Sequence, residues 1–290
     1  MPRGVYDRSA AKARRLALKQ QAAGQQFQPV ALNRRPETDA EVDARIAERF
    51  SVLELITNSV IEGDARALIV SGPAGLGKSF TVEKVMREWD PEEVNHTFVK
   101  GYVKATGLFK LLWQYRRKGQ VIVFDDADSV FFDDVSLNLL KAVCDTTERR
   151  RVSWLSEASL VDTDSAEVID KSFDFDGAIV FITNKDFDEE IDRGTKLAPH
   201  LQAMLSRAHY VDLTMKTKQD YLVRIRQVVK QGLLSNLNWH AASEVMRFVE
   251  DNHEKLRELS LRMVIKVANL RKSQPANWQR IAKQTCIKGF

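Results

Sequence analysis

Short apolar runs and helical patterns alternate over the first two thirds of the chain. Five runs of three to seven residues, rich in Val, Ile and Phe, are typical of buried strands. Residues 39–62 place apolar side chains at helical spacing, which predicts one helix, or two, packed against the first strand. Further helical patterns separate the later runs. The predicted strands cover residues 68–70, 97–103, 120–124, 178–182 and 209–213.

The strand pattern stops after Thr214. This change from mixed to all-helical sequence predicts a boundary near Lys216. We therefore expect an α/β domain over residues 37–215 and a helical domain over residues 216–290, preceded by an arm of residues 1–36. The helical patterns after the boundary cover residues 218–232, 239–254, 260–271 and 276–287.

A glycine-rich segment joins the first predicted strand to a helical pattern. Its sequence, G-P-A-G-L-G-K-S, matches G-x-x-x-x-G-K-[ST], and the order of strand, loop and helix favours a nucleotide site over a plain turn. Glycines let backbone N–H groups surround an anion, and the helix start adds its positive end. Lys78 is placed to reach the β- and γ-phosphates, and the Ser79 hydroxyl to bind Mg²⁺. The segment and the residue after it are Gly72, Pro73, Ala74, Gly75, Leu76, Gly77, Lys78, Ser79 and Phe80.

Polar residues follow two of the later strands. Asp125 directly follows the apolar run 120–124, where its carboxylate can hold Mg²⁺ through water, and Asp126 can orient an attacking water molecule. A strand that ends in an ordinary polar turn is the alternative, but the upstream loop favours the functional interpretation. Asn184 follows the run 178–182, and in a sheet of this type that position lies next to the γ-phosphate.

The composition is typical of a globular protein that does not span a membrane. The chain has 290 residues, its hydrophobic fraction of 44% is ordinary for a globular protein, and no apolar run approaches a membrane span or a secretory signal. We therefore expect no membrane association. The two cysteines, Cys144 and Cys286, have no neighbouring ligand pattern, which argues against a disulfide framework or a zinc site. A reducing, cytoplasmic location fits these features.

Positive charge is concentrated in residues 1–36. This arm has eight Lys or Arg against one Asp, so the chain's total of +4 leaves −3 for the remainder. Its composition predicts disorder in isolation, with a nascent helix possible over residues 9–23. Contact with the DNA or RNA backbone is one interpretation of the arm. A solvated tail, a segment that docks another protein and a transit peptide are the alternatives. Residues 156–177 carry seven acids against one Lys and predict an exposed hairpin or loop.

Over residues 40–275 these motifs, in this order, resemble the AAA+ ATPases. The resemblance implies a five-stranded parallel P-loop sheet with a C-terminal all-helical lid, and hydrolysis of ATP with Mg²⁺. Residues 72–79 look like Walker A, and Asp125 with Asp126 looks like Walker B. Asn184 is similar to sensor 1, which positions the hydrolytic water. Arg207, in L-S-R-A, is similar to the arginine finger that acts on a neighbouring subunit, and Arg262, in L-S-L-R, is similar to sensor 2. The resemblance also implies a homo-oligomer, usually a ring of six.

Two departures from the family pattern bear on function. Walker B usually ends Asp-Glu, and the shorter Asp126 predicts slower hydrolysis unless Asp128 assists. The segment after the second strand offers only Tyr102 and Lys104 as pore-loop contacts, which weakens a threading role. Remodelling of a nucleic-acid or nucleoprotein complex is the first functional hypothesis. A protein-remodelling chaperone and a slowly hydrolysing, ATP-dependent assembly scaffold remain as alternatives.

Overall fold

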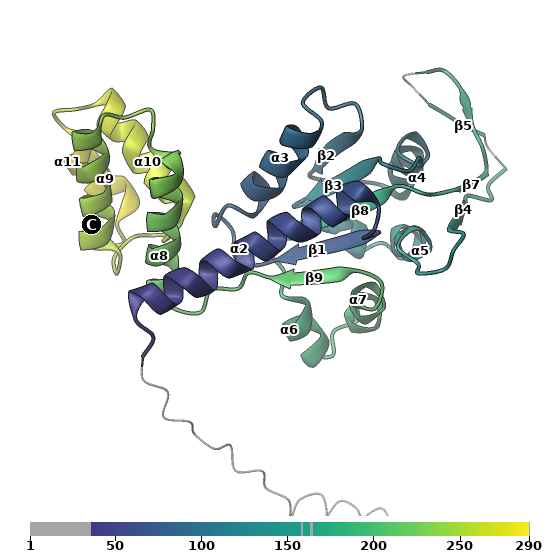
Figure 1. Cartoon of the computed structure of the whole chain (residues 1–290), viewed down its shortest axis with the longest axis horizontal. Helices are drawn as coiled ribbons and strands as arrows, with labels where there is room; N and C mark the ends of the chain where they lie inside the picture. The colour runs from purple at the N-terminus through teal and green to yellow at the C-terminus, as the bar shows by residue number, and fades with distance from the viewer. Residues whose placement is uncertain (1–35, 158, 163–164, 290) are drawn as a thin grey trace, which may run out of the picture. The chain divides into compact units, whose positions relative to one another are not determined.

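A five-stranded parallel sheet lies at the centre of the computed structural model, which describes residues 36–157, 159–162 and 165–289 (Figure 1). The predicted arm therefore lies outside the described residues except for Pro36, and so does the predicted nascent helix. Thr38–Phe290 forms one compact unit, and the sheet belongs to it. The strands are β1 (Ala67–Ser71), β2 (His96–Lys100), β3 (Val121–Asp125), β8 (Ala178–Thr183) and β9 (His209–Asp212), in the spatial order β2-β3-β8-β1-β9.

Alternate residues of the central strands face two separate cores, as the two-residue period of a strand requires. Leu68 and Val70 of β1 contribute to one core, together with apolar residues of α2 (Asp39–Glu62) and α3 (Lys78–Trp89). Ile69 faces the other core, which is lined by α4 (Ala105–Gln114), α5 (Asp134–Val143), α6 (Phe187–Asp192) and α7 (Ala198–Leu205). Helices thus cover both faces of the sheet, which explains why the central strands are apolar up to their last residue.

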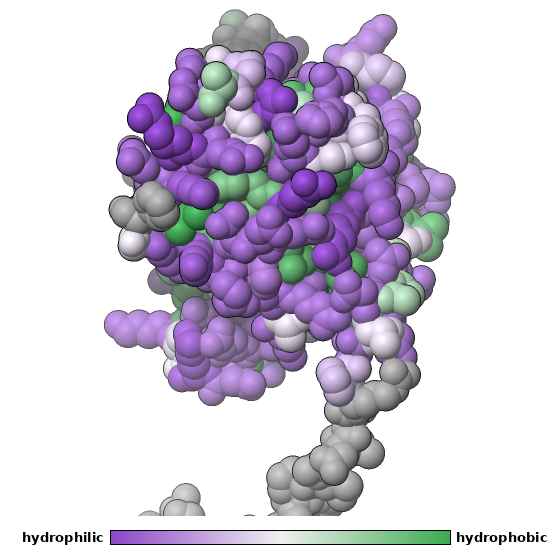
Figure 2. Space-filling model, turned by 90° about the vertical axis from the view of Figure 1, so that its left-hand side faces the viewer, coloured by the Kyte–Doolittle hydropathy of each residue, from purple (hydrophilic) through white to green (hydrophobic). Residues whose placement is uncertain are grey.

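A group of helices follows β9 and has a third core of its own. The group consists of α8 (Lys218–Val228), a π-helical turn (Val229–Leu233), α9 (Trp239–Asn252), α10 (Leu261–Ser273) and α11 (Trp278–Cys286). The predicted fold class, a five-stranded parallel α/β sheet followed by an all-helical C-terminal part, is confirmed. Figure 2 views this part of the molecule and shows a mainly hydrophilic surface with smaller hydrophobic patches.

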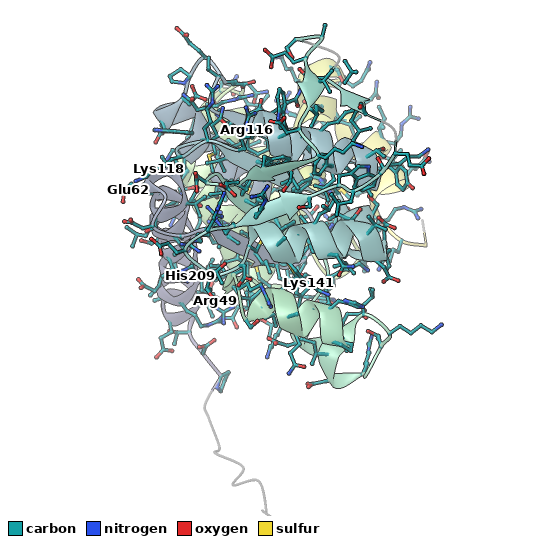
Figure 3. The ribbon with its side chains drawn as sticks, turned by 90° about the vertical axis from the view of Figure 1, so that its right-hand side faces the viewer. Arg49, Glu62, Arg116, Lys118, Lys141 and His209 are labelled. Atoms are coloured by element: carbon teal, nitrogen blue, oxygen red, sulfur yellow. The ribbon has the colours of Figure 1, made fainter. Side chains whose placement is uncertain are left out.

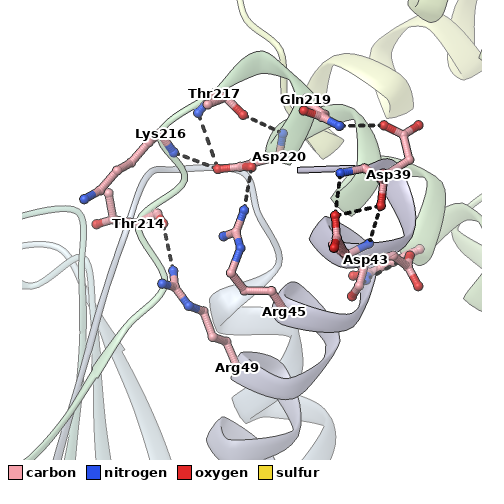
Figure 4. Close-up of polar contacts among 12 residues, drawn as sticks. Asp39, Asp43, Arg45, Arg49, Thr214, Lys216, Thr217, Gln219 and Asp220 are labelled. Atoms are coloured by element: carbon pink, nitrogen blue, oxygen red, sulfur yellow. Dashed lines mark hydrogen bonds and ion pairs between the residues drawn. The ribbon is translucent and has the colours of Figure 1, made fainter. Parts of the chain in front are cut away.

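Polar contacts join α2 to the segment that enters α8 (Figure 4). Arg45 donates to Asp220 at 3.0 Å, and Arg49 donates to the Thr214 carbonyl at 3.0 Å. Asp220 also accepts from the backbone N–H of Lys216 at 3.0 Å. Burial, which opposes ionisation, is outweighed by these hydrogen bonds, so the pKa of Asp220 lies below its ordinary value. The start of the helical group is therefore fixed to the helix that precedes the sheet.

The segment between α5 and β8 forms two short antiparallel ladders. β4 (Arg151–Ser153) pairs with β7 (Ser172–Asp174), and β5 (Leu160–Val161) pairs with β6 (Val168–Ile169). The hairpin expected for residues 156–177 is present, although its first strand begins earlier than predicted. A 3-10 helix at Asp128–Phe131 and the helix α6 were not predicted. Among the helices of the described residues, none is long and apolar enough to cross a membrane.

Candidate functional site

The loop between β1 and α3 has a backbone that only glycine adopts readily. Gly75 has φ +74° and Gly77, which caps α3, has φ +93°, both in the left-handed region. A Cβ at Gly75 would lie 2.8 Å from the Cβ of Ser260, and the Gly75 carbonyl accepts from the N–H of Leu261 at 2.9 Å. The loop therefore lies directly against the start of α10. The predicted phosphate loop is positioned between the sheet and the C-terminal helices.

Lys78 begins α3 and is only 5% exposed. The amine donates to the Pro73 carbonyl at 2.9 Å and to Asn184 Oδ1 at 2.9 Å, and it also contacts the Gly72 carbonyl. Burial lowers the pKa of Lys78 to about 8, an effect that the carboxylates of Asp126 and Asp125 oppose. A buried amine held by neutral oxygens is suited to bind an anion that enters the loop.

Ser79 and Asp125 lie together, although they are 46 positions apart in the sequence. The Ser79 hydroxyl donates to Asp125 Oδ1 at 2.7 Å, and Lys100 Nζ lies 3.0 Å from Asp125 Oδ2. A hydroxyl and a carboxylate are hard oxygen donors of the kind that Mg²⁺ binds beside substrate phosphates. The two residues predicted as metal ligands thus fit that ion.

Asp126 and Asn184 meet at the carboxyl ends of β3 and β8. Asn184 Nδ2 donates to Asp126 Oδ1 at 2.8 Å, so that Asn184 joins Lys78 to Asp126. Asp126 has φ +53°, a conformation that Asp tolerates better than most residues. The side chain of Asp128 accepts instead from Thr183 Oγ1 at 2.8 Å, and burial raises the pKa of Asp128. Asp126, rather than Asp128, therefore faces the loop.

A cavity of about 890 Å³ opens between the loop, α2 and the C-terminal helices. It is large enough for a nucleotide-sized ligand. Four basic side chains line it: Lys78, Lys84, Arg224 and Arg262. Of the predicted site residues, those that line the cavity are Ala74, Gly75, Gly77, Lys78, Ser79, Phe80, Asp126, Asn184 and Arg262.

Arg224, in α8, is a site residue that the sequence reasoning missed. It is 4% exposed, its guanidinium lies 3.3 Å from the centre of the Phe50 ring, and Nε donates to the Leu76 carbonyl at 3.2 Å. Burial lowers the pKa of Arg224 to about 10 although the charge of Glu54 opposes this. The spacing of residues in α8 could have indicated its burial. Arg224 lies three residues after Tyr221 and four before Val228, so it shares the apolar face of the helix.

Arg207 is not brought to this cavity. It lies two residues before His209, which pairs with Leu68 near the start of β1, whereas the loop follows the end of β1. At 3.3 Å per residue, Leu68 and the end of β1 at Ser71 are roughly 10 Å apart along the strand. Figure 3 labels His209 with Lys118 and Glu62, which precede β3 and β1. Arg207 donates to the Ala203 carbonyl at 2.8 Å, and its predicted role in a neighbouring subunit stays a prediction.

Comparison with known proteins gives a clear relative. The chain is 37% identical over 254 residues to the uncharacterized 36.7 kDa protein in the nrdC-mobD intergenic region of Enterobacteria phage T4, and the match spans 85% of this chain and 76% of that protein. No family model matches.

Two groups of solved structures are similar at low identity. A point mutant of RuvB from Thermotoga maritima is 14% identical, with a TM-score of 0.48, over 87% of this chain and 73% of that one. NtrX from Brucella abortus in complex with ATP is 12% identical, with a TM-score of 0.39, over 92% and 57%. The sequence relationship is the informative one, and by it the chain belongs to the family of the T4 36.7 kDa protein.

Proposed function

We propose that this protein is an AAA+ ATPase that binds and hydrolyses Mg-ATP. The observation that carries the proposal is the buried amine of Lys78, which lies inside a glycine loop, is held by neutral oxygens and lines a cavity with three other basic side chains. A triphosphate is the kind of anion that a glycine loop, a helix start and a buried amine bind together. The size of the cavity supports a whole nucleotide as the ligand.

The residues around the loop have separate roles in this proposal. Lys78 and Arg262 bind the β- and γ-phosphates, while Ser79 and Asp125 hold Mg²⁺. Bound magnesium would neutralise phosphate charge as the terminal phosphoryl group departs. Asp126, oriented by its hydrogen bond from Asn184, positions the water that attacks. These roles are catalysis by positioning and charge stabilisation.

The placement of Arg207 supports an oligomer. Because Arg207 lies toward the opposite end of β1 from the loop, it is suited to reach the cavity of another copy rather than its own. A head-to-tail contact that closes forms a ring. We propose a ring of six or an open spiral, assembled in the cytoplasm, that remodels a nucleic-acid or nucleoprotein complex. The basic residues 1–36 would contact the phosphate backbone.

Mixing two inactive variants tests this function. Lys78→Ala removes nucleotide binding but keeps Arg207, and Arg207→Ala keeps the nucleotide site. Each variant alone should be nearly inactive, and an equimolar mixture should recover part of the wild-type ATPase rate. The wild-type rate per chain should also rise with protein concentration. A rate that is independent of concentration, together with full activity of Arg207→Ala, would contradict the shared site.

The nucleic-acid part of the proposal has a separate test. DNA and RNA should raise the ATPase rate of the full chain, and deletion of residues 1–36 should abolish that stimulation while leaving the basal rate unchanged. The stimulation should weaken steeply with salt, because the contact is with phosphates. Stimulation by unfolded protein instead of DNA or RNA would favour the chaperone alternative.

A further inference from the structure

Lys100 is a basic residue next to the proposed magnesium site that the proposed function does not use. It is the last residue of β2, and the register of the sheet pairs it with Asp125, the last residue of β3. Its amine lies 3.0 Å from Asp125 Oδ2. The ion pair is therefore a consequence of strand register as well as of side-chain conformation.

The carboxylate of Asp125 is engaged on both oxygens. Ser79 donates to Oδ1 at 2.7 Å, and Lys100 contacts Oδ2. Asp125 is 4% exposed, so its charge is shielded from solvent. The charges of Glu83 and Asp126 add to the negative environment of the amine.

The two partners differ in their freedom to move. The Lys100 side chain is 62% exposed, whereas that of Asp125 is 6% exposed. A lysine amine on a four-carbon stem can move into water at small cost, because the ammonium is strongly hydrated there. Asp125 is held in place by β3 and Ser79. An incoming cation would therefore displace the lysine and leave the carboxylate where it is.

We propose that Lys100 is a built-in competitor of Mg²⁺ for Asp125, so that it raises the magnesium concentration needed to retain a nucleoside triphosphate. This inference rests on the proposed nucleotide site. A carboxylate that is already neutralised by a lysine attracts Mg²⁺ less strongly than a free one. Release of Lys100 accompanies loading of the metal, and its return to Asp125 accompanies metal loss.

The test is an equilibrium titration of the full chain with a fluorescent ATP analogue at a series of free Mg²⁺ concentrations. Removing the competitor with Lys100→Met should lower the half-saturating Mg²⁺ concentration about two- to fivefold, the size expected for one exposed ion pair. Binding of the analogue in excess EDTA should not change. Lys100→Arg, which keeps the charge, should restore the wild-type midpoint.

Lys118→Met is the matched control. Lys118 is exposed and precedes the start of β3, at the end of the sheet opposite to the site, so the variant makes the same change in net charge away from the site (Figure 3). Its magnesium midpoint should equal that of the wild type. A midpoint in Lys100→Met that is unchanged or raised would overturn the competitor role.

Two other results would also overturn it. Weaker binding of the analogue by Lys100→Met in EDTA would mean that Lys100 contacts the phosphates directly. Failure of the folded wild-type protein to bind the analogue with or without Mg²⁺ would remove the proposed function together with this inference. If the wild type binds the analogue and the magnesium midpoint of Lys100→Met equals that of Lys118→Met, the competitor role is refuted and the proposed nucleotide site stands.

Discussion

Replacing Arg224 with methionine should make the nucleotide-free protein more stable and its binding of ATP weaker. Arg224 is 4% exposed, and its hydrogen bonds go to neutral acceptors, the Leu76 carbonyl and the Gln227 amide oxygen. Burial of a charge without a close counter-ion disfavours the folded state. Methionine fills similar space along the Phe50 ring without the charge.

The magnitude follows from the pKa of Arg224. A fall from 12.5 to about 10 corresponds to roughly 3 kcal/mol against the charged form in the folded state. Loss of the stacking on Phe50 offsets up to about 2 kcal/mol of this. The net expected gain is about 1–3 kcal/mol, or a rise in Tm of roughly 2–12 °C. Because the folded pKa lies below the unfolded one, the penalty is fully present below pH 10 and the gain should not vary between pH 6 and 8.

Two measurements check this prediction. Thermal unfolding without nucleotide should give the higher Tm, and titration with ATP should give affinity lowered by about tenfold or more, the size of one charge-assisted hydrogen bond. Arg247→Met, on the exposed face of α9, should change neither quantity appreciably. A variant of Arg224 with lower Tm and unchanged ATP affinity would contradict this prediction, because the arginine would then have a structural role only.

Three further substitutions have defined outcomes. Gly75→Ala should lose about 1–3 kcal/mol more stability than Gly194→Ala in denaturant unfolding. Both glycines have positive φ, but only an alanine at Gly75 would contact Ser260. Equal losses of unfolding free energy in the two variants would contradict this prediction. Asp126→Asn should lower kcat at least about 100-fold with little change in ATP affinity, and a normal kcat would exclude its role. Asp220→Asn should cost about 1–3 kcal/mol at pH 7. Because the folded pKa lies below the ordinary value of 3.8, this stability is fully present above pH 3.8 and is lost as pH falls through the folded pKa. The difference between wild type and variant should therefore shrink progressively below pH 3.8, and a difference that stays constant there would contradict this.

The strands and the phosphate loop could be predicted from the sequence because local signals specify them. The three central strands, β1, β3 and β8, are short apolar runs buried on both faces, and such runs need no long-range information to be recognised. The loop is specified by its glycines and by the lysine and serine that follow. The pairing of Ser79 with Asp125 was also predictable, since parallel strands bring their carboxyl ends to one edge of the sheet.

Other parts of the site depend on contacts between distant segments. Arg224 donates to the Leu76 carbonyl, although the two residues are 148 positions apart in the sequence. No local sequence pattern predicts that α8 packs against the loop. The contact of Lys100 with Asp125 depends on the register of β2 and β3, which the sequence alone does not specify. The short helix α6 was missed because six residues carry too little periodicity, although Asp186 caps it through the N–H of Glu189 at 3.0 Å.

The proposed function depends on Lys78 binding the phosphates of ATP in the glycine loop. The decisive experiment is calorimetric titration of the full-length protein with ATP and Mg²⁺, beside a Lys78→Ala variant of equal thermal stability. The wild type should bind one nucleotide per chain, with a dissociation constant of about 1 µM to 1 mM, and the variant should bind at least tenfold more weakly. Equally tight binding by Lys78→Ala, or no saturable binding by the folded wild-type protein, would contradict the proposed function.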